Sequence, residues 1–256
     1  KCADIEFSAE DASRSDHAFL AQCYSNAIAA GATTLNVPDT VGYSTPQEMA
    51  ELIGFLRENV VGAENVDFSV HCHDDLGMAV ANSLACVKAG ATQVECTVNG
   101  IGERAGSCPL EPLVMSLQCL YGQDTGIKYD ELLGLSHEVA ARSGKPVPPT
   151  KAIVGNRLFG WETGLPTGYW LKSREMNPLI MMPYHFSMTG QPAPHIYIGK
   201  KSGAANVTLV NERLGLAQIE DKDKVKELLH KVKELSIQVK RDLTDEVYTK
   251  LYHEVV

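Results

Sequence analysis

The chain has 256 residues, 44% of them hydrophobic and 21% charged, which is enough to bury a substantial apolar core and excludes intrinsic disorder. No apolar run approaches the roughly 20 residues of a membrane-spanning helix and the first residues show no signal-peptide pattern, so we predict a soluble protein that does not bind membranes. A net charge of −9 argues against nucleic-acid binding, and seven cysteines without a CxxC pair indicate a reducing compartment, the cytoplasm.

Four short segments are predicted to be β-strands, and each of the first three is followed by a helical stretch. The strands are expected at residues 3–8, 33–37, 66–71 and 93–98, with starts about 30 residues apart, the length of one strand-plus-helix unit. Between them, one helix is capped by Ser15 or Asp16, and the next opens at Thr45-Pro46. Strands joined in this order by right-handed crossovers form a parallel sheet.

A weak internal repeat favours a (β/α)8 barrel over an open doubly wound sheet. Ala-Gly-Ala-Thr at residues 30–33 recurs at residues 89–92, two units further on, and the phosphate-binding glycine loop of doubly wound sheets is absent. Four units make half a barrel, and the chain begins directly with a strand and without Met. We therefore predict an α/β fold that is the C-terminal half of a (β/α)8 TIM barrel, with an amino-terminal half of similar length missing.

The second part of the chain is predicted to be less regular. After a helix over residues 129–142, a stretch rich in Pro, Gly, Met and aromatic residues has no clear period, and a charged amphipathic pattern near the end indicates helices. We predict three domains, namely the half barrel at residues 1–148, a loop-rich linker subdomain at residues 149–215 and a small helical subdomain at residues 216–256.

The most specific chemical signal is the run His-Cys-His-Asp-Asp-Leu-Gly at residues 71–77. His71 and His73 at the end of a strand point to the same side, so both imidazoles can reach one ion, and in a parallel barrel this strand end is the catalytic mouth. We predict metal binding, with a hydrogen-bonded structural pair as the alternative. Asp74 and Asp75 are candidates to orient the imidazoles, and a helix cap is the alternative for Asp75.

The other strand ends place polar residues at the same edge. The first strand leads into Ser8 and Glu10, the second into Thr40, and the fourth into a loop that contains Arg104. Taken alone, a strand-end Ser or Thr is more often a turn or cap residue than a substrate contact. Beside two candidate metal ligands, these residues become candidates for substrate binding.

Four motifs resemble those of one enzyme family. They are Phe-Ser-Ala-Glu-Asp-Ala-Ser-Arg at residues 7–14, Pro-Asp-Thr-Val-Gly-Tyr at 38–43, the His-Cys-His run, and Asn-Gly-Ile-Gly-Glu-Arg-Ala-Gly at 99–106. In this order they closely resemble the 2-isopropylmalate synthases and their relatives, the homocitrate and citramalate synthases, of the DRE-TIM metallolyase superfamily. The resemblance covers most of residues 3–120.

This resemblance implies an acyltransferase that performs a metal-dependent Claisen condensation of acetyl-CoA with a 2-oxo acid. The residues that it implicates are the metal ligands His71, His73 and Ser107, the catalytic residues Glu10 and Thr40, and the substrate-binding residues Ser8, Thr40 and Arg104. Many relatives carry Asn in place of Ser107, and the family's acidic ligand lies on a strand that this chain lacks. Zn²⁺, Mg²⁺ and Mn²⁺ all suit this ligand set, and the family suggests a homodimer.

One departure argues against a plain leucine-pathway enzyme. Pro166 stands where 2-isopropylmalate synthases carry a catalytic histidine, and His185 and His195 are the candidate replacements. We therefore leave the 2-oxo acid unassigned. The alternatives are a carbon–carbon lyase similar to 3-hydroxy-3-methylglutaryl-CoA lyases, whose cysteine-bearing loop is faintly matched at residues 106–108, and a non-catalytic paralogue. The clustered polar groups at the strand ends argue against the paralogue.

Overall fold

The structure, a computed structural model, describes residues 2–256 and divides into two units. The first unit extends to Lys128 and includes Gly134–Val147, and the second contains Tyr129–Leu133 and Pro148–Val256. Among the described residues, no helix combines the length and the apolar character needed to cross a membrane. The three predicted domains stay a prediction.

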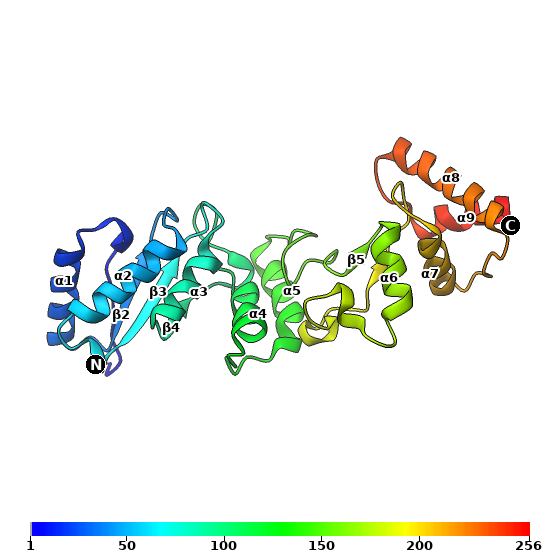
Figure 1. The fold of residues 1–256 in the computed structure, drawn as a ribbon. Helices are drawn as coiled ribbons and strands as arrows, with labels where there is room; N and C mark the ends of the chain where they lie inside the picture. The colour runs from blue at the N-terminus through cyan, green and yellow to red at the C-terminus, as the bar shows by residue number, and fades with distance from the viewer. Residues whose placement is uncertain (1) are drawn as a thin grey trace. The chain divides into compact units, whose positions relative to one another are not determined.

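The first unit is built on a four-stranded parallel sheet with the strand order β1-β2-β3-β4 (Figure 1). The strands are β1 (Glu6–Ser8), β2 (Thr34–Asp39), β3 (Asp67–Cys72) and β4 (Gln93–Glu95). The helices are α1 (His17–Ala29), α2 (Pro46–Asn59), α3 (Ala79–Ala89), α4 (Leu110–Tyr121) and α5 (Leu132–Ser143). Short 3₁₀ turns are η1 (Ala12–Arg14), η2 (Ala63–Asn65) and η3 (Val98–Gly100). Each of the four predicted strands overlaps one of the strands β1 to β4.

The helix starts follow the local signals of the sequence. Asp16 caps α1 by accepting a hydrogen bond from the backbone N–H of Phe19 at 2.8 Å. Thr45 and Glu48 form a capping box at the start of α2, and Pro46 occupies its first turn. Because these caps fix where the helices begin, they also set the length of the loops that leave the strand ends.

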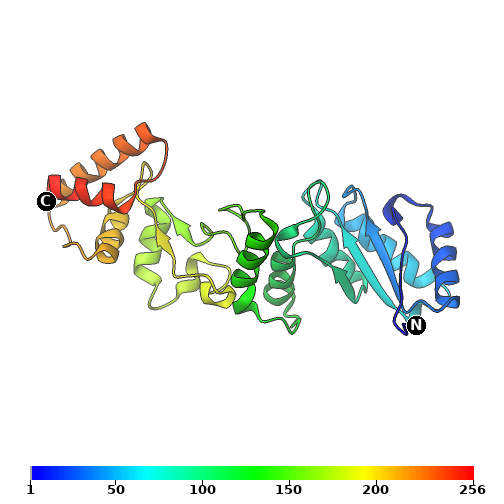
Figure 2. The same ribbon diagram turned by 180° about the vertical axis from the view of Figure 1, so that it is seen from behind.

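The two faces of the sheet differ in polarity. Leu35, Val37, Phe68 and Val70 are buried in a core that includes residues of α1, α2 and α3, and the views from the front and from behind show α2 and α3 on one side of the strands (Figures 1 and 2). The alternate positions form a polar band in which strand neighbours are Glu6 with Thr34, Ser8 with Asn36, Asn36 with Ser69, Ser69 with Gln93, and His71 with Glu95. The band runs along the face opposite the helices.

Leu35 lies in the middle of β2 and is completely buried, at 0% exposure. Leu35→Ala removes its packing and leaves a cavity, so we expect the free energy of unfolding to fall by about 2–5 kcal/mol. Urea denaturation measures this loss. The matched control is Leu120→Ala on α4, a side chain that is 74% exposed; it should change the free energy of unfolding by less than about 0.5 kcal/mol. Equal losses in the two variants would contradict the placement of β2 in the core.

The second unit combines a two-stranded parallel sheet with helices and turns. Its strands are β5 (Gly160–Trp161) and β6 (His195–Ile196). Its helices are α6 (Gly164–Ser173), α7 (Ala204–Leu214), α8 (Lys222–Val239) and α9 (Asp245–Val255), with 3₁₀ turns η4 (Tyr129–Glu131), η5 (Pro178–Met181) and η6 (Phe186–Thr189). The two helices that end the chain agree with the amphipathic pattern, and Asp221 and Thr244 cap them.

The predicted fold class needs a correction. The assignment to the C-terminal half of a (β/α)8 barrel, followed by a loop-rich extension and a helical subdomain, is wrong. The parallel sheet starts near the amino-terminus of the chain, and its strands and alternating helices are arranged like those of the amino-terminal part of a TIM barrel. The physical reason for the error is that every unit of a barrel has the same strand–helix period, so the period does not reveal which units a chain contains.

Candidate functional site

Two histidines face each other at the carboxyl end of β3. His71 is partly buried, His73 is buried, and their Nε2 atoms lie 3.2 Å apart. Two nitrogen ligands, each about 2.1 Å from an ion, lie 3.2 Å apart when the angle at the ion is about 100°, which suits tetrahedral or octahedral coordination. The distance between these atoms therefore suits two ligands of one divalent ion, as well as a hydrogen bond from one ring to the other.

The surroundings of His71 favour its neutral imidazole. Burial, and then repulsion from His73, lower the pKa of His71 below its usual value of 6.5. The Nδ1 atoms of both rings are buried. Nδ1 of His71 lies 3.1 Å from Oε2 of Glu95, but neither Nδ1 atom makes a hydrogen bond of standard geometry with the described residues. Neutral imidazole is the form that binds metal ions, so the lowered pKa of His71 also fits a metal ligand.

The loop after β4 brings Ser107 to His73. The two residues are paired through an isolated antiparallel β-bridge, and Ser107 is buried. Gly106 permits this approach because its φ is +94°, a value that L side chains rarely adopt, and because a Cβ atom there would collide with the carbonyl oxygen of Gly100. The structure thus places the third predicted ligand beside the second.

Arg104 and Thr40 take part in contacts between the strand-end loops. The guanidinium of Arg104 donates to both carboxylate oxygens of Asp75, at 2.9 and 3.1 Å, and to the carbonyl oxygen of Thr40 at 2.6 Å. This ion pair lowers the pKa of Asp75. The hydroxyl of Thr40 accepts a hydrogen bond from the backbone N–H of Asp11 at 2.8 Å. The loops that follow β1, β2, β3 and β4 therefore meet at one edge of the sheet.

The two aspartates of the histidine motif hold the loop rather than the imidazoles. Asp74 accepts a hydrogen bond from the backbone N–H of Ala79 at 3.0 Å, at the first residue of α3. The carboxylate of Asp75 accepts hydrogen bonds from the guanidinium of Arg104. Among the described residues, neither aspartate accepts a hydrogen bond from the ring of His71 or His73.

Ser8 is linked to the histidine pair through two residues that the sequence analysis missed. Both Ser8 and Glu10 are exposed, the first at the end of β1 and the second just beyond it. The side-chain amide of Asn36 donates to the hydroxyl of Ser8 and to Oε1 of Glu95, each at 3.1 Å. Oε2 of Glu95 lies 3.1 Å from Nδ1 of His71. The signal that reveals Asn36 and Glu95 is the alternation of polar residues along all four strands.

A buried carboxylate anchors the loop that carries Thr40. Asp39, the last residue of β2, is 0% exposed. It accepts hydrogen bonds from the hydroxyl of Ser13 at 3.0 Å and from the backbone N–H and the hydroxyl of Ser44, both at 3.2 Å. Because a buried carboxylate is costly without such partners, its full set of donors marks Asp39 as a fixed point of the loop.

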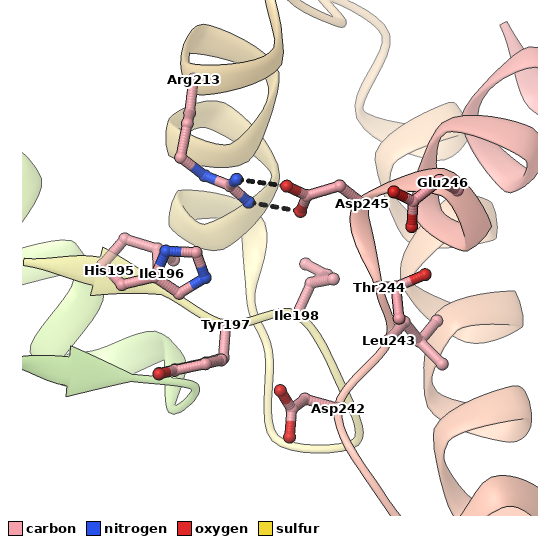
Figure 3. A pocket seen from close by; sticks show the side chains of 10 residues that line it. All are labelled: His195, Ile196, Tyr197, Ile198, Arg213, Asp242, Leu243, Thr244, Asp245 and Glu246. Carbon is pink, nitrogen blue, oxygen red and sulfur yellow. Dashed lines mark hydrogen bonds and ion pairs between the residues drawn. The ribbon is translucent and has the colours of Figure 1, made fainter. Parts of the chain in front are cut away.

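A second candidate site is a pocket of about 310 Å³ in the second unit, next to β6, α7 and the start of α9 (Figure 3). Arg213 and Asp245 face each other there in a bidentate ion pair at 2.6 and 2.7 Å. His195 lines the pocket, and burial followed by the charge of Arg213 lowers its pKa. His185 caps η6 in the same unit. Arg213 and Asp245 neutralise each other, so this ion pair presents little net charge to a ligand. The edge of the parallel sheet is therefore the better candidate site.

Glu6 and Glu95 both lie on the polar band, and the pKa of Glu6 is unusually high for a carboxyl group. Hydrogen bonding with Glu95, burial and repulsion from Glu95 raise the pKa of Glu6 to about 7. A carboxyl group with a raised pKa stabilises the folded chain at low pH, and this stabilisation is lost as the pH rises from 4.5 to about 7. We expect the free energy of unfolding to decline more over this range in the wild-type chain than in Glu6→Gln. Urea denaturation at a series of pH values measures both, and identical pH dependence would contradict the assignment.

The model of the HMGL-like family matches residues 1–139, a range that includes the predicted metal ligands and the residues Ser8, Glu10, Thr40 and Arg104. The chain is 46% identical to the 2-isopropylmalate synthase of Pyrococcus furiosus over 94% of this chain and 48% of that protein. It is 40% identical to the 2-isopropylmalate synthase of Geobacillus stearothermophilus over 98% of this chain and 48% of that protein.

The chain therefore spans about half the length of these relatives. Among solved structures, the HMG-CoA lyase of Bacillus subtilis is similar, with a TM-score of 0.50 and 21% sequence identity, over 57% of this chain and 51% of that chain. At this identity the likeness shows the fold alone.

Proposed function

This chain belongs to the HMGL-like family, and from that premise we propose that the protein carrying it is an acyltransferase of the 2-isopropylmalate synthase type. It condenses acetyl-CoA with a 2-oxo acid, and hydrolysis of the thioester yields a 2-alkylmalate-type product and free CoA. The identity of 40–50% to 2-isopropylmalate synthases supports this reaction. The observation that carries it is the facing pair of His71 and His73, with Nε2 atoms 3.2 Å apart.

In this proposal His71 and His73 hold a divalent ion, with Ser107 as a further ligand. The ion, when bound, supplies a Lewis acid that polarises the carbonyl group of the 2-oxo acid. The described residues contain no group of three or more His, Cys, Asp or Glu side chains placed to hold a metal. Substrate oxygens, water or other protein groups therefore have to complete the coordination. Zn²⁺, Mg²⁺ and Mn²⁺ are all compatible with imidazole and oxygen ligands.

The remaining strand-end residues act on the substrates. Glu10 and Thr40 are the proposed catalytic residues, because an exposed carboxylate and a hydroxyl at this edge are able to exchange protons and to orient the reacting groups. Ser8, Thr40 and Arg104 are the proposed contacts of the 2-oxo acid. Since the guanidinium of Arg104 is paired with Asp75, a substrate carboxylate has to compete with Asp75 for it.

The test is the release of CoA from acetyl-CoA by the intact protein with a panel of 2-oxo acids. We expect release with 3-methyl-2-oxobutanoate, the acid that gives 2-isopropylmalate, and loss of release when a chelator removes the ion. Pyruvate and 2-oxoglutarate complete the panel and report selectivity. Cleavage of 3-hydroxy-3-methylglutaryl-CoA without any condensation would identify a lyase instead, and metal binding without turnover would identify a non-catalytic paralogue.

A homodimer and a cytoplasmic location belong to the same proposal. All seven cysteines are free, which supports a reducing compartment. Sedimentation of the intact protein tests the dimer, and a mass of one subunit at micromolar concentration would contradict it.

A further inference from the structure

Glu95 lies next to His71 on the polar band, and the proposed reaction gives it no role. Adjacent strands bring the two residues into direct register, because His71 on β3 pairs with Glu95 on β4. Oε2 of Glu95 lies 3.1 Å from Nδ1 of His71, the ring nitrogen that does not face His73. That Nδ1 atom is buried, and it makes no hydrogen bond of standard geometry with the described residues.

Neighbouring side chains hold the carboxylate of Glu95 in this place. Oε1 accepts a hydrogen bond from the side-chain amide of Asn36 at 3.1 Å, and Asn36 is only 3% exposed. On the same band, Gln93 of β4 donates to Oε2 of Glu6 at 2.7 Å. Contacts from β2 and β3 therefore converge on one carboxylate, which limits its freedom to turn away from His71.

We propose that Glu95 is a positioning residue that accepts the Nδ1 proton of His71. A neutral imidazole carries its proton on one of two nitrogens, and a carboxylate at Nδ1 selects the tautomer in which Nε2 is unprotonated. The lone pair of Nε2 then faces His73, where it would be available to bind a divalent ion. The inference rests on the proposed function, because the ion is part of that function.

The tautomer of His71 tests this role directly in the metal-free intact protein. Long-range ¹H–¹⁵N correlation spectra of ¹⁵N-histidine-labelled protein at about pH 8, where imidazole is neutral, distinguish the two tautomers. We expect His71 to be protonated at Nδ1, and to shift toward the Nε2-protonated form in Glu95→Gln, whose amide is a weaker acceptor. Glu95→Gln keeps the size of the side chain and so protects folding, and Glu95→Ala should shift the tautomer further.

Metal affinity provides the second measurement. Titration of the intact protein with Co²⁺, followed by its visible absorption, should show an affinity about 10–100-fold lower in Glu95→Gln than in the wild type. Glu58→Gln, an exposed change on α2, is the matched control and should alter neither the tautomer nor the affinity. An unchanged His71 tautomer in both Glu95 variants would overturn the proposal.

The two measurements separate this inference from the proposed function. If the tautomer shifts while no condensation activity is found, the role of Glu95 stands and the proposed function fails. If condensation is found while the tautomer is the same in the wild type and the variants, the proposed function stands and the role of Glu95 fails.

Discussion

Replacement of His71 or His73 by alanine is expected to abolish metal dependence together with condensation by the intact protein. Each variant removes one of the two facing Nε2 atoms, which lie 3.2 Å apart, and leaves a single imidazole to hold the ion. Loss of a Lewis acid removes several kcal/mol of transition-state stabilisation, so we expect the rate to fall at least about 1000-fold. CoA release and Co²⁺ titration of the same preparations measure both effects.

The control for these variants is His137→Ala, an exposed histidine of α5 in the same unit. It should leave Co²⁺ affinity and turnover unchanged. Wild-type turnover that persists under a chelator, or full activity in either His71→Ala or His73→Ala, would contradict the metal assignment. The folded state of each variant is checked by its urea denaturation midpoint, because His73 is buried and its loss leaves a small cavity.

The sequence predicted the histidine pair but not its neighbour Glu95, for a physical reason. Residues i and i+2 of one strand share a face by strand geometry alone, so His71 and His73 could be paired without a structure. The contact of Glu95 with His71 and Asn36 depends on the register of three strands, and Asn36 and Glu95 are 59 positions apart in the sequence. A hydrophobic pattern identifies strands, whereas register comes from packing.

Only part of the fold was predicted correctly, for a similar reason. Helix caps at Asp16 and Thr45 involve residues three positions apart, and such short-range contacts could be predicted from the sequence. The position of the four strand–helix units within a barrel has no short-range signal, and that prediction was wrong. The ion pair of Arg104 with Asp75 shows the same limit, since the two residues are 29 positions apart; the role of Arg104 as a substrate contact stays a prediction.

Gly106→Ala is expected to disrupt the candidate site without touching any predicted ligand. The backbone at Gly106 has a φ of +94°, and the added Cβ atom would collide with the carbonyl oxygen of Gly100. The loop therefore has to move, which breaks the bridge between Ser107 and His73 and the hydrogen bond of 2.9 Å from the Asp74 N–H to the Gly106 carbonyl. We expect Co²⁺ affinity and turnover to fall at least about 10-fold, because a site displaced by about 1 Å loses its productive geometry.

Gly31→Ala is the control for Gly106→Ala, because it introduces backbone strain without a collision. Gly31 also has a positive φ, +106°, but a Cβ atom there meets nothing within 4 Å. This variant therefore carries only the conformational cost of a side chain in the left-handed region, about 1–2 kcal/mol of unfolding free energy, and should bind Co²⁺ like the wild type. Urea denaturation and Co²⁺ titration of both variants give the comparison. If Gly106→Ala behaves like Gly31→Ala, the close approach of this loop to β3 does not shape the metal site, and Ser107 loses its place among the proposed ligands.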